Sequence, residues 1–376
     1  MNAEDVHGDA IIIGGGPAGA ATACHLARTG KNTLLIEKEK QAHHKVCGEF
    51  LSFEAQYYMR ALGVDAARLG AAPISHIRLM SGKHVACARL PFQALGLSRF
   101  VLDEELLARA VMFGAEIKRG LQVKRVMPVD GRWRIETNAQ DAYAADAVFL
   151  ATGKHELHAL KRGPDQQNDF IGFKMHFSCT PRQRRTLANY IDLILFDGGY
   201  AGLQLVEDQK ANLCLVINRQ RFAQLGKKWD VLLEYLARSS AHIQAFLDVA
   251  TPSWGRPTAI ASIPYGYIHG STPKLANRIF RLGDQFAVIP SFSGDGVSIA
   301  LHTAKLAAET YLTFGNDPAI FHRYARNEIQ PQMRAASLVA SAIKKPAVRS
   351  IGLVVCRAFP SLVTHMASRT RLRAFA

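Results

Sequence analysis

Cysteine is scarce in this chain and shows no paired arrangement. The six cysteines are scattered over 376 residues, several within apolar runs typical of buried, reduced thiols. The fourteen histidines do not combine with cysteines or carboxylates at metal-ligand spacing. We therefore expect a protein without disulfides or a bound metal, located in the cytoplasm.

Long apolar runs are also absent. No uninterrupted stretch reaches the roughly 20 residues that a helix needs to cross a bilayer. The first nine residues are polar and acidic, so we expect the apolar run at Ile11 to be a strand and not part of a signal peptide. The length and the 48% hydrophobic content indicate a globular protein, large enough for two domains.

Acidic residues are too few to balance the basic ones, which leaves a net charge of +15. The excess is concentrated after Gly315, where ten basic residues meet only Asp317 and Glu328. Apolar residues such as Ile351 and Val355 interleave with them. Two interpretations stay open: a basic amphipathic helix at the inner face of a membrane, or a solvated helix packed on the body. No nucleic-acid motif accompanies the charge, so we expect no nucleic-acid partner.

A glycine-rich turn follows the first apolar strand. Residues 11–19 read Ile-Ile-Ile-Gly-Gly-Gly-Pro-Ala-Gly, and an alanine-rich helix comes next. Glycines let the backbone approach a phosphate, while the helix N-terminus presents unpaired N–H groups and a favourable dipole. The turn is therefore the predicted site of a dinucleotide pyrophosphate. The expected contacts are Gly14, Gly16, Pro17, Ala18 and Gly19.

The second half of the dinucleotide fingerprint is present as well. Gly30 stops the first helix, and residues 33–36 form another apolar strand. Glu37 ends that strand, at the offset of about twenty residues where an acid accepts hydrogen bonds from ribose hydroxyls. We count Glu37 and the adjacent Lys38 among the cofactor contacts.

Hydrophobic periodicity predicts the remaining elements. Helices are expected at 53–62, 101–110, 226–250 and 297–314, strands at 76–90, 121–126, 133–137, 147–151 and 278–282, and an antiparallel sheet at 170–218. The predicted fold class is α/β, a Rossmann-like nucleotide-binding domain with an inserted antiparallel-sheet substrate domain and a C-terminal helical tail. The expected boundaries are 1–165 and 273–315 for the first domain, which includes part of the sheet domain near 74–98, then 166–272 for the second and 316–376 for the tail.

Gly283-Asp284 and the segment Pro-Ser-Phe-Ser-Gly-Asp-Gly-Val at 290–297 resemble elements of FAD-dependent monooxygenases and reductases with a p-hydroxybenzoate-hydroxylase-like fold. The resemblance implies that the aspartate binds the ribityl chain of FAD. It also implies that the second turn opens a helix toward the flavin, where a helix N-terminus stabilises the charge of the reduced ring. The implied contacts are Asp284, Pro290, Gly294, Gly296 and Val297.

Residues 45–49, Lys-Val-Cys-Gly-Glu, are similar to the Cys-Gly element of geranylgeranyl reductases. The resemblance implies that Cys47 and Gly48 contact the flavin and that Arg99 binds FAD. Cys47 is a candidate redox thiol or proton donor, and Lys45 a candidate stabiliser of flavin charge. The alternatives are a small residue that only lets the backbone approach, and a lysine that points to solvent.

Residues 151–155, Ala-Thr-Gly-Lys-His, depart from the Asp-Gly pair with which related monooxygenases touch both flavin and NADPH. The missing acid argues against NADPH-driven hydroxylation, although Gly153 and Val123 stay among the implied FAD contacts. The Trp-x-Trp-x-Ile-Pro element of tryptophan halogenases is missing too. The sequence contains no second dinucleotide motif, so NAD(P)H would visit as a transient electron donor, or another protein would supply electrons.

Polar residues near these motifs allow further interpretations. His43 and His44 either shuttle protons or stand idle in solvent. Lys174 and His176 alternate along one predicted strand, so both face the cleft or both face water.

The inserted region predicts an apolar pocket and hence a lipophilic substrate, isoprenoid or polyketide-like, whose double bond is reduced at the flavin. A monooxygenase of an aromatic or polyketide substrate, and an electron-transfer flavoprotein without its own substrate, stay open as alternatives. The residues expected to line the pocket are Phe170, Ile171, Phe173, Phe177, Leu193, Leu195 and Phe196.

Overall fold

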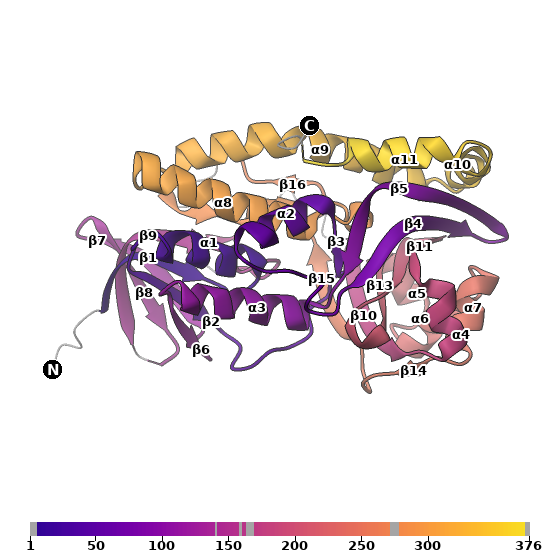
Figure 1. Ribbon diagram of the computed structural model, residues 1–376, viewed down its shortest axis with the longest axis horizontal. Coiled ribbons are helices and arrows are strands. Elements are labelled where there is room, and N and C mark those ends of the chain that lie inside the picture. The colour runs from indigo at the N-terminus through magenta and orange to yellow at the C-terminus, as the bar shows by residue number, and fades with distance from the viewer. Residues whose placement is uncertain (1–5, 140, 158–159, 163–168, 271–277, 373–376) are drawn as a thin grey trace.

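Two β-sheets lie side by side in the computed structural model, with helices packed over both (Figure 1). The structure describes residues 6–139, 141–157, 160–162, 169–270 and 278–372. The chain begins in the first sheet and ends in helices that extend across to the second. The α/β class and the helical C-terminal part are confirmed.

The first sheet carries the nucleotide fingerprint. Its strands are β1 (Val6–Ile13), β2 (Thr33–Glu37), β6 (Glu116–Arg119), β7 (Val123–Val129), β8 (Arg132–Thr137), β9 (Ala142–Leu150) and β17 (Phe280–Arg281). Their order is β6-β2-β1-β9-β8-β7, with β17 beside β9. The pairs of β1 with β2 and β9 are parallel, and every residue of β2 is buried, as expected for a parallel strand covered on both faces.

Helices cover one face of this sheet and form the largest core. They are α1 (Pro17–Ala27), α2 (Phe53–Ala61), α3 (Arg99–Met112), α8 (Gly296–Phe314) and α9 (Pro318–Lys344). Serine hydroxyls define where two of them begin, since Ser52 accepts from the Ala55 amide and Ser98 from the Val101 amide. On the other face, Ile11 packs in a second cluster that includes Trp133.

Glycine is required at two positions of the first turn. A Cβ at Gly19 would lie 1.9 Å from the Gly14 carbonyl oxygen, and one at Gly14 would lie 2.5 Å from the Ala151 oxygen. Gly14 also has a φ of 107°. These two residues therefore let α1 start directly against β1 and β9.

The second sheet has nine strands and combines early and middle parts of the chain. They are β3 (Phe50–Leu51), β4 (Ala72–Ser81), β5 (His84–Gly96), β10 (Phe170–Ser178), β11 (Asn189–Phe196), β12 (Gly199–Leu205), β13 (Ala211–Asn218), β14 (Thr251–Pro252) and β15 (Thr258–Ile263). The order is β14-β10-β13-β12-β11-β4-β5-β3, with β15 beside β10. Among the described residues of this sheet, only β4 and β11 pair in parallel. A separate small sheet pairs β16 (Tyr267–Ile268) with β18 (Ala287–Val288).

Short helices pack on one face of the second sheet. They are α4 (Pro181–Leu187), α5 (Arg219–Gln224), α6 (Trp229–Ala237) and α7 (Ala241–Leu247). The predicted helix at 226–250 is thus two helices, because the Ser240 side chain caps a new start by accepting from the His242 amide. The predicted strand at 278–282 is confined to β17.

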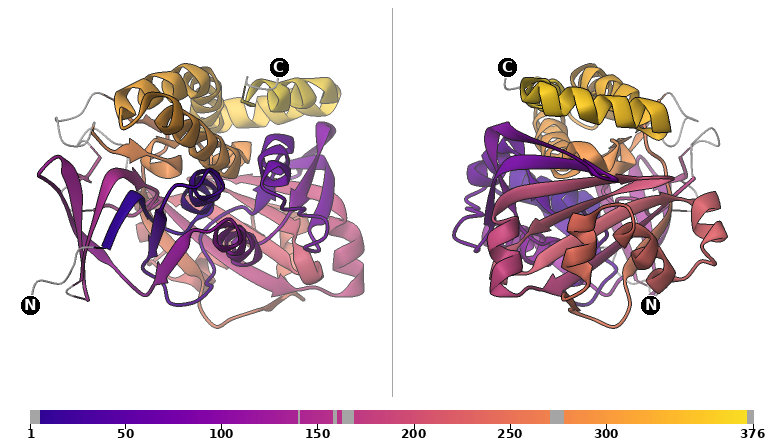
Figure 2. Two further views of the ribbon diagram at one scale, coloured as in Figure 1. Left: turned by 60° about the vertical axis from the view of Figure 1, so that its left-hand side comes forward. Right: turned by 90° about the vertical axis from the view of Figure 1, so that its right-hand side faces the viewer.

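The C-terminal helices extend over the second sheet. After α9, α10 (Pro346–Ala358) and α11 (Pro360–Arg369) each begin with a proline at the first helical position and pack against β5 (Figure 2). In the described part of the chain no single helix is long and apolar enough to span a membrane. The pair α10 and α11, bent by 109°, meets that length and composition criterion only together.

Candidate functional site

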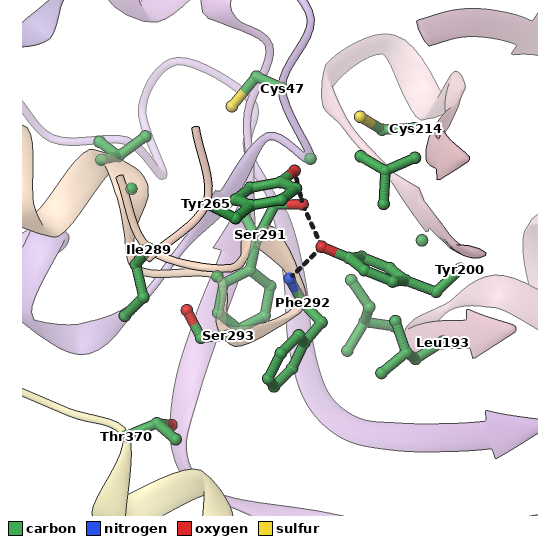
Figure 3. Close-up of a pocket in the computed structure, with 18 of the residues that line it drawn as sticks. Cys47, Leu193, Tyr200, Cys214, Tyr265, Ile289, Ser291, Phe292, Ser293 and Thr370 are labelled. Carbon is green, nitrogen blue, oxygen red and sulfur yellow. Dashed lines mark hydrogen bonds between the residues drawn. The ribbon is translucent and has the colours of Figure 1, made fainter. Parts of the chain in front are cut away.

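A cavity of about 430 Å³ lies between the two sheets and the C-terminal helices. Its lining comes from the first glycine turn, the Cys47 loop, one face of the second sheet, the turn before α8, and α9 to α11. Figure 3 shows part of this lining, with Cys47, Tyr200 and Tyr265 arranged around the open space. Segments far apart in sequence therefore meet at one site.

Strand alternation decides which apolar residues reach the cavity. The cavity is lined by alternate residues of β11, namely Ile191, Leu193 and Leu195. The intervening Ile194 and the following Phe196 point to the opposite face and pack in the core under α5 to α7. The pairing register continues the cavity-facing row into both neighbouring strands. Leu193 lies opposite Gly202 of β12 and Leu79 of β4, and both partners also line the cavity.

Five of the seven predicted pocket residues are wrong. Phe173, Phe177 and Phe196 belong to the core beneath the sheet, and Ile171 packs against it. Phe170 packs in a separate cluster with Tyr265. Successive strand residues point to opposite faces, so an apolar strand buried on both sides gives only half of its residues to a pocket.

The first glycine turn lines the cavity through Gly16, Pro17 and Ala18. Glu37 holds the turn, because its carboxylate accepts the Gly15 amide at 2.5 Å and also the Glu39 amide at 3.0 Å. The predicted acid therefore lies beside the first glycine turn. Lys38, by contrast, is exposed and lies 3.6 Å from a Glu39 carboxylate oxygen.

A charged cluster stands next to this turn. Arg99 makes a bidentate pair with Asp103, at 2.6 and 2.8 Å, and the Lys45 ammonium lies 2.8 Å from the same carboxylate. A Cβ on Gly16 would lie 3.2 Å from the Arg99 guanidinium, which lines the cavity. Lys45 instead lines a small neighbouring pocket with Glu37, away from the main cavity.

Asp284 and Gly153 line the cavity close to the first turn, since a Cβ at the neighbouring Gly283 would lie 3.2 Å from the Ala18 side chain. The Lys154 ammonium lies 2.8 Å from the Asp284 carboxylate. Burial alone would raise the pKa of Asp284, but Lys154 outweighs it and holds that pKa below its usual value. Asp284 is therefore ionised and can accept hydrogen bonds from cofactor hydroxyls.

The turn before α8 supplies a further wall. Gly294, Gly296 and Val297 line the cavity, and Pro290 is buried just ahead of them. Gly294 has a φ of 75°, and a Cβ there would lie 2.6 Å from the Phe50 ring. Glycine is thus required at this bend.

Val123 does not line the cavity. It is buried with Ile135 in the cluster on the opposite face of the first sheet. The start of β7 turns this side chain inward, so an FAD contact at Val123 would have to come from the backbone, and the implied contact stays a prediction.

The Cys47 loop is held from behind by side chains of the second sheet. Asn212 donates to the carbonyl oxygens of Cys47 and Gly48, at 3.2 and 2.9 Å, and Gln204 donates to that of Glu49 at 2.9 Å. Cys47 and Gly48 line the cavity. The loop backbone is therefore fixed against the open space.

Glu49 is the centre of a buried ionic group. Its carboxylate pairs with the Lys174 ammonium and lies 2.6 Å from the His176 ring, and all three side chains are buried. Burial would raise the pKa of Glu49, but the His176 hydrogen bond and Lys174 lower it overall. Lys174 and His176 thus face neither cleft nor water, contrary to both sequence interpretations.

His44 packs against this group and is not idle in solvent. Its ring stacks on Trp254 at 4.4 Å and on Phe100 at 5.1 Å. Burial, with a contribution from Lys174, lowers the pKa of His44 to about 4. His44, Glu49 and His176 lie close enough to surround a cation, and the Lys174 ammonium already supplies that positive charge.

Sequence reasoning missed this group, although a signal was present. Lys174 and His176 are polar residues two apart in a strand whose alternate residues are apolar, and Asn212 lies opposite His176 in β13. Gln204 lies opposite Asn212 in turn. Polar residues at alternate positions of an otherwise apolar strand lie on one face of the sheet. When that face is buried, such residues need hydrogen-bond partners, and here a loop packed on the sheet provides them.

Three hydroxyls form a second feature that sequence reasoning missed. Tyr200 and Tyr265 both hydrogen-bond the Ser291 hydroxyl, at 2.6 and 2.7 Å, and the Phe292 amide donates to Tyr200 (Figure 3). Burial raises the pKa of Tyr200 to about 12 and that of Tyr265 well above 10. Both phenols line the cavity and stay protonated at neutral pH.

The cavity suits a flat cofactor, because glycines without side chains let such a group lie directly against the backbone. A Cβ added at Gly48, Gly153 or Gly296 would meet no atom within 4 Å, although all three residues line the cavity. The first turn and Glu37 suit the nucleotide half of FAD, and Asp284 suits its ribityl chain. Gly48 and the turn before α8 flank the space for the flavin ring.

Solved structures share this fold. The flavin-dependent brominase Bmp2 has a TM-score of 0.79 at 18% identity, over 96% of this chain and 93% of that one. P. aeruginosa PqsL in complex with 2-aminobenzoylacetate has a TM-score of 0.74 at 16% identity, over 93% of this chain and 99% of that one. At these identities the likeness concerns the fold alone.

Curated relatives extend the comparison to sequence. Menaquinone reductase of Mycobacterium tuberculosis is 25% identical over 334 residues, which cover 82% of this chain and 77% of that protein. Digeranylgeranylglycerophospholipid reductase 1 of Methanopyrus kandleri is 24% identical over 317 residues, covering 80% and 79%. The family model for pyridine nucleotide-disulphide oxidoreductases matches residues 8–205. The chain therefore belongs to that family and is an FAD-dependent oxidoreductase.

Proposed function

We propose that this enzyme reduces a carbon–carbon double bond in a lipophilic, isoprenoid-like substrate. The observation that carries the proposal is the apolar chamber that continues from the flavin space to α10 and α11. Leu79, Leu193 and Leu195 form its sheet side, and Leu353 and Val363 form its helical side. Such a wall binds hydrocarbon and excludes water.

Saturating a double bond requires a hydride for one carbon and a proton for the other. Bound FAD, once reduced, supplies the hydride. The side chains of this protein must supply the proton, and the candidates are Tyr200 and Tyr265, whose protonated phenols line the cavity. Ser291 bridges them, so a proton given up by one phenol can be replaced through the other.

The names of the relatives support reduction. One is a reductase of menaquinone and another a reductase of digeranylgeranylglycerophospholipid, and both of these molecules are lipophilic. The absence of the Asp-Gly pair at 151–155, where Lys154 instead pairs with Asp284, is consistent with an enzyme other than an NADPH-driven hydroxylase. NAD(P)H is proposed only as a transient donor that reduces the flavin.

Product analysis tests this function. The FAD-loaded enzyme is reduced without oxygen and supplied with menaquinone in detergent, then air is admitted and the product is analysed by mass spectrometry. We expect two added hydrogen atoms in the side chain that survive air, since a quinol ring alone would reoxidise. A product that instead gains an oxygen atom, formed only in air, would contradict reduction and indicate a monooxygenase.

A further inference from the structure

The outer face of α10 and α11 is apolar and exposed. Ile351 and Phe359 are 64% and 61% exposed, values expected of polar residues on a surface helix. Other large side chains join them on the same two helices. The exposed apolar residues of this face are Ile351, Val354, Val355, Phe359 and Leu362, whereas Val348 and Met366 are partly exposed but line the chamber.

Positive charge surrounds this face without any acid to balance it. No aspartate or glutamate occurs after Glu328. The exposed basic residues on and beside the two helices are Lys344, Lys345, Arg357 and Arg369, whereas Arg349 faces the cavity and donates to the Phe196 carbonyl oxygen. Lys345 and Arg357 are exposed. An apolar helix face with a basic rim matches the physical chemistry of an anionic bilayer surface.

The same two helices form a wall of the substrate chamber. Leu353 of α10 and Val363 of α11 are buried on the inner face and line the cavity, while Ile351 and Phe359 point outward. Both sides of a single helical layer are therefore apolar. In Figure 2 this layer lies at the edge of the molecule, above β4 and β5.

We propose that the α10–α11 face docks on an anionic lipid bilayer and lies in the plane of its interface. The 109° bend between the helices and the packing of their inner faces on the chamber suit a surface position. Docking brings the chamber wall against the membrane, where a lipophilic substrate is dissolved. This last consequence rests on the proposed function, whereas docking itself does not.

Vesicle flotation of the FAD-loaded full chain tests the proposal. Vesicles of phosphatidylcholine alone are compared with vesicles that also contain phosphatidylglycerol, and we expect strong binding only to the latter. The double variant Ile351→Gln with Phe359→Gln should bind at least about tenfold more weakly, because two large apolar side chains no longer insert. The variant Lys345→Gln with Arg357→Gln should lose about fivefold per charge.

Matched controls carry the same changes elsewhere. Met112→Gln with Val249→Gln replaces two apolar residues that are 72% and 59% exposed, and Lys227→Gln with Lys228→Gln removes two charges from an exposed loop. Both controls should bind like the wild type. Equal binding to both vesicle types, or full binding by the Ile351 and Phe359 variant, would overturn the proposal.

Turnover in detergent separates this result from the proposed function. Failure to reduce menaquinone in detergent, with vesicle binding intact, would count against the proposed reaction alone. Turnover in detergent without vesicle binding would count against docking alone. Unchanged flavin absorbance and circular dichroism establish that each variant is folded.

Discussion

At the scale of single residues, the Glu49 carboxylate fixes the backbone that borders the flavin space. Glu49 has a φ of 58° and accepts the Arg99 amide at 2.8 Å besides its contacts with Lys174 and His176. A buried ammonium without its carboxylate is costly, while an exposed ion pair contributes little. The geometry of the Cys47 loop therefore depends on this group.

Replacing Glu49 tests that dependence. Glu49→Gln should lower the free energy of unfolding by about 3–5 kcal/mol, because the Lys174 charge stays buried without a partner. The matched change Glu116→Gln, in an exposed pair with Lys118, should cost less than about 1 kcal/mol. Denaturant unfolding at neutral pH measures both.

The pH dependence of the same variant provides a second measurement. Since the folded-state pKa of Glu49 is lowered, its contribution is present above its unfolded pKa near 4.5 and is lost as pH falls through the folded value. The stability difference between wild type and Glu49→Gln should therefore shrink on acidification. A constant difference down to acid unfolding would contradict an ionised Glu49.

The two phenols of the cavity should act as proton donors. The variant Tyr200→Phe with Tyr265→Phe should lower the rate of double-bond reduction by about 10²–10⁴-fold while it leaves FAD bound. Tyr235→Phe, a phenol that donates to the Asp197 carbonyl oxygen outside the cavity, is the matched control. Because the Tyr200 pKa is about 12, the wild-type rate of this step should not fall between about pH 6 and 9. A double variant with the wild-type rate would exclude both phenols.

At the scale of elements, the sequence predicts most strands and helices but not which strand face meets the cavity. The fingerprint at 11–37 is local, so its turn, helix and Glu37 follow from glycine chemistry and chain order. The chamber wall is not local. Leu193 lines the cavity, whereas Phe196 lies on the opposite face of β11. The pairing of β11 with β4 and β12 determines which of these faces meets the cavity, and periodicity alone does not reveal that pairing.

The C-terminal helices show the same limit of local pattern. Apolar and basic residues after Gly315 predict an amphipathic helix, and the structure has three helices there, α9, α10 and α11, with α11 starting at Pro360. Their inner face covers the chamber because Arg371, beyond α11, donates to the Ser293 carbonyl oxygen at 3.0 Å and also pairs with Asp295. Contacts between residue 371 and residues 293–295 depend on tertiary structure.

Two substitutions on α10 separate the chamber wall from the outer face. In detergent, Leu353→Gln should raise the KM for a lipophilic substrate about tenfold, because a buried amide without a partner costs about 1–3 kcal/mol. Ile351→Gln changes an exposed neighbour and should leave kcat and KM unchanged. Steady-state kinetics compare the two, and equal effects would contradict the assignment of faces.

At the scale of the whole molecule, the cofactor site is assembled from distant segments. Four glycines from separate parts of the chain line one cavity: Gly16, Gly48, Gly153 and Gly296. A ligand bound among them links the two sheets and stabilises the fold by mass action. Stability should therefore depend on FAD concentration.

Filling the flavin space with a side chain should abolish that dependence. Gly48→Val places its side chain in the open cavity, so the apoprotein should fold. Gly255→Val is the matched control, because it makes the same change in an exposed loop where a Cβ likewise meets no atom within 4 Å. At a free FAD concentration 100-fold above Kd, wild type and Gly255→Val should gain about 2.7 kcal/mol and Gly48→Val none. Thermal unfolding with and without FAD measures the gain, and an equal gain in both variants would place FAD elsewhere.

The most direct test of the account is the reoxidation of reduced enzyme-bound flavin, followed by stopped-flow absorbance without oxygen after mixing with a polyprenyl substrate in detergent. We predict oxidation of the flavin at a rate that rises with substrate concentration, matched by one saturated double bond per flavin. Flavin that stays reduced until oxygen is admitted would contradict the claim that the apolar chamber presents a double bond for reduction.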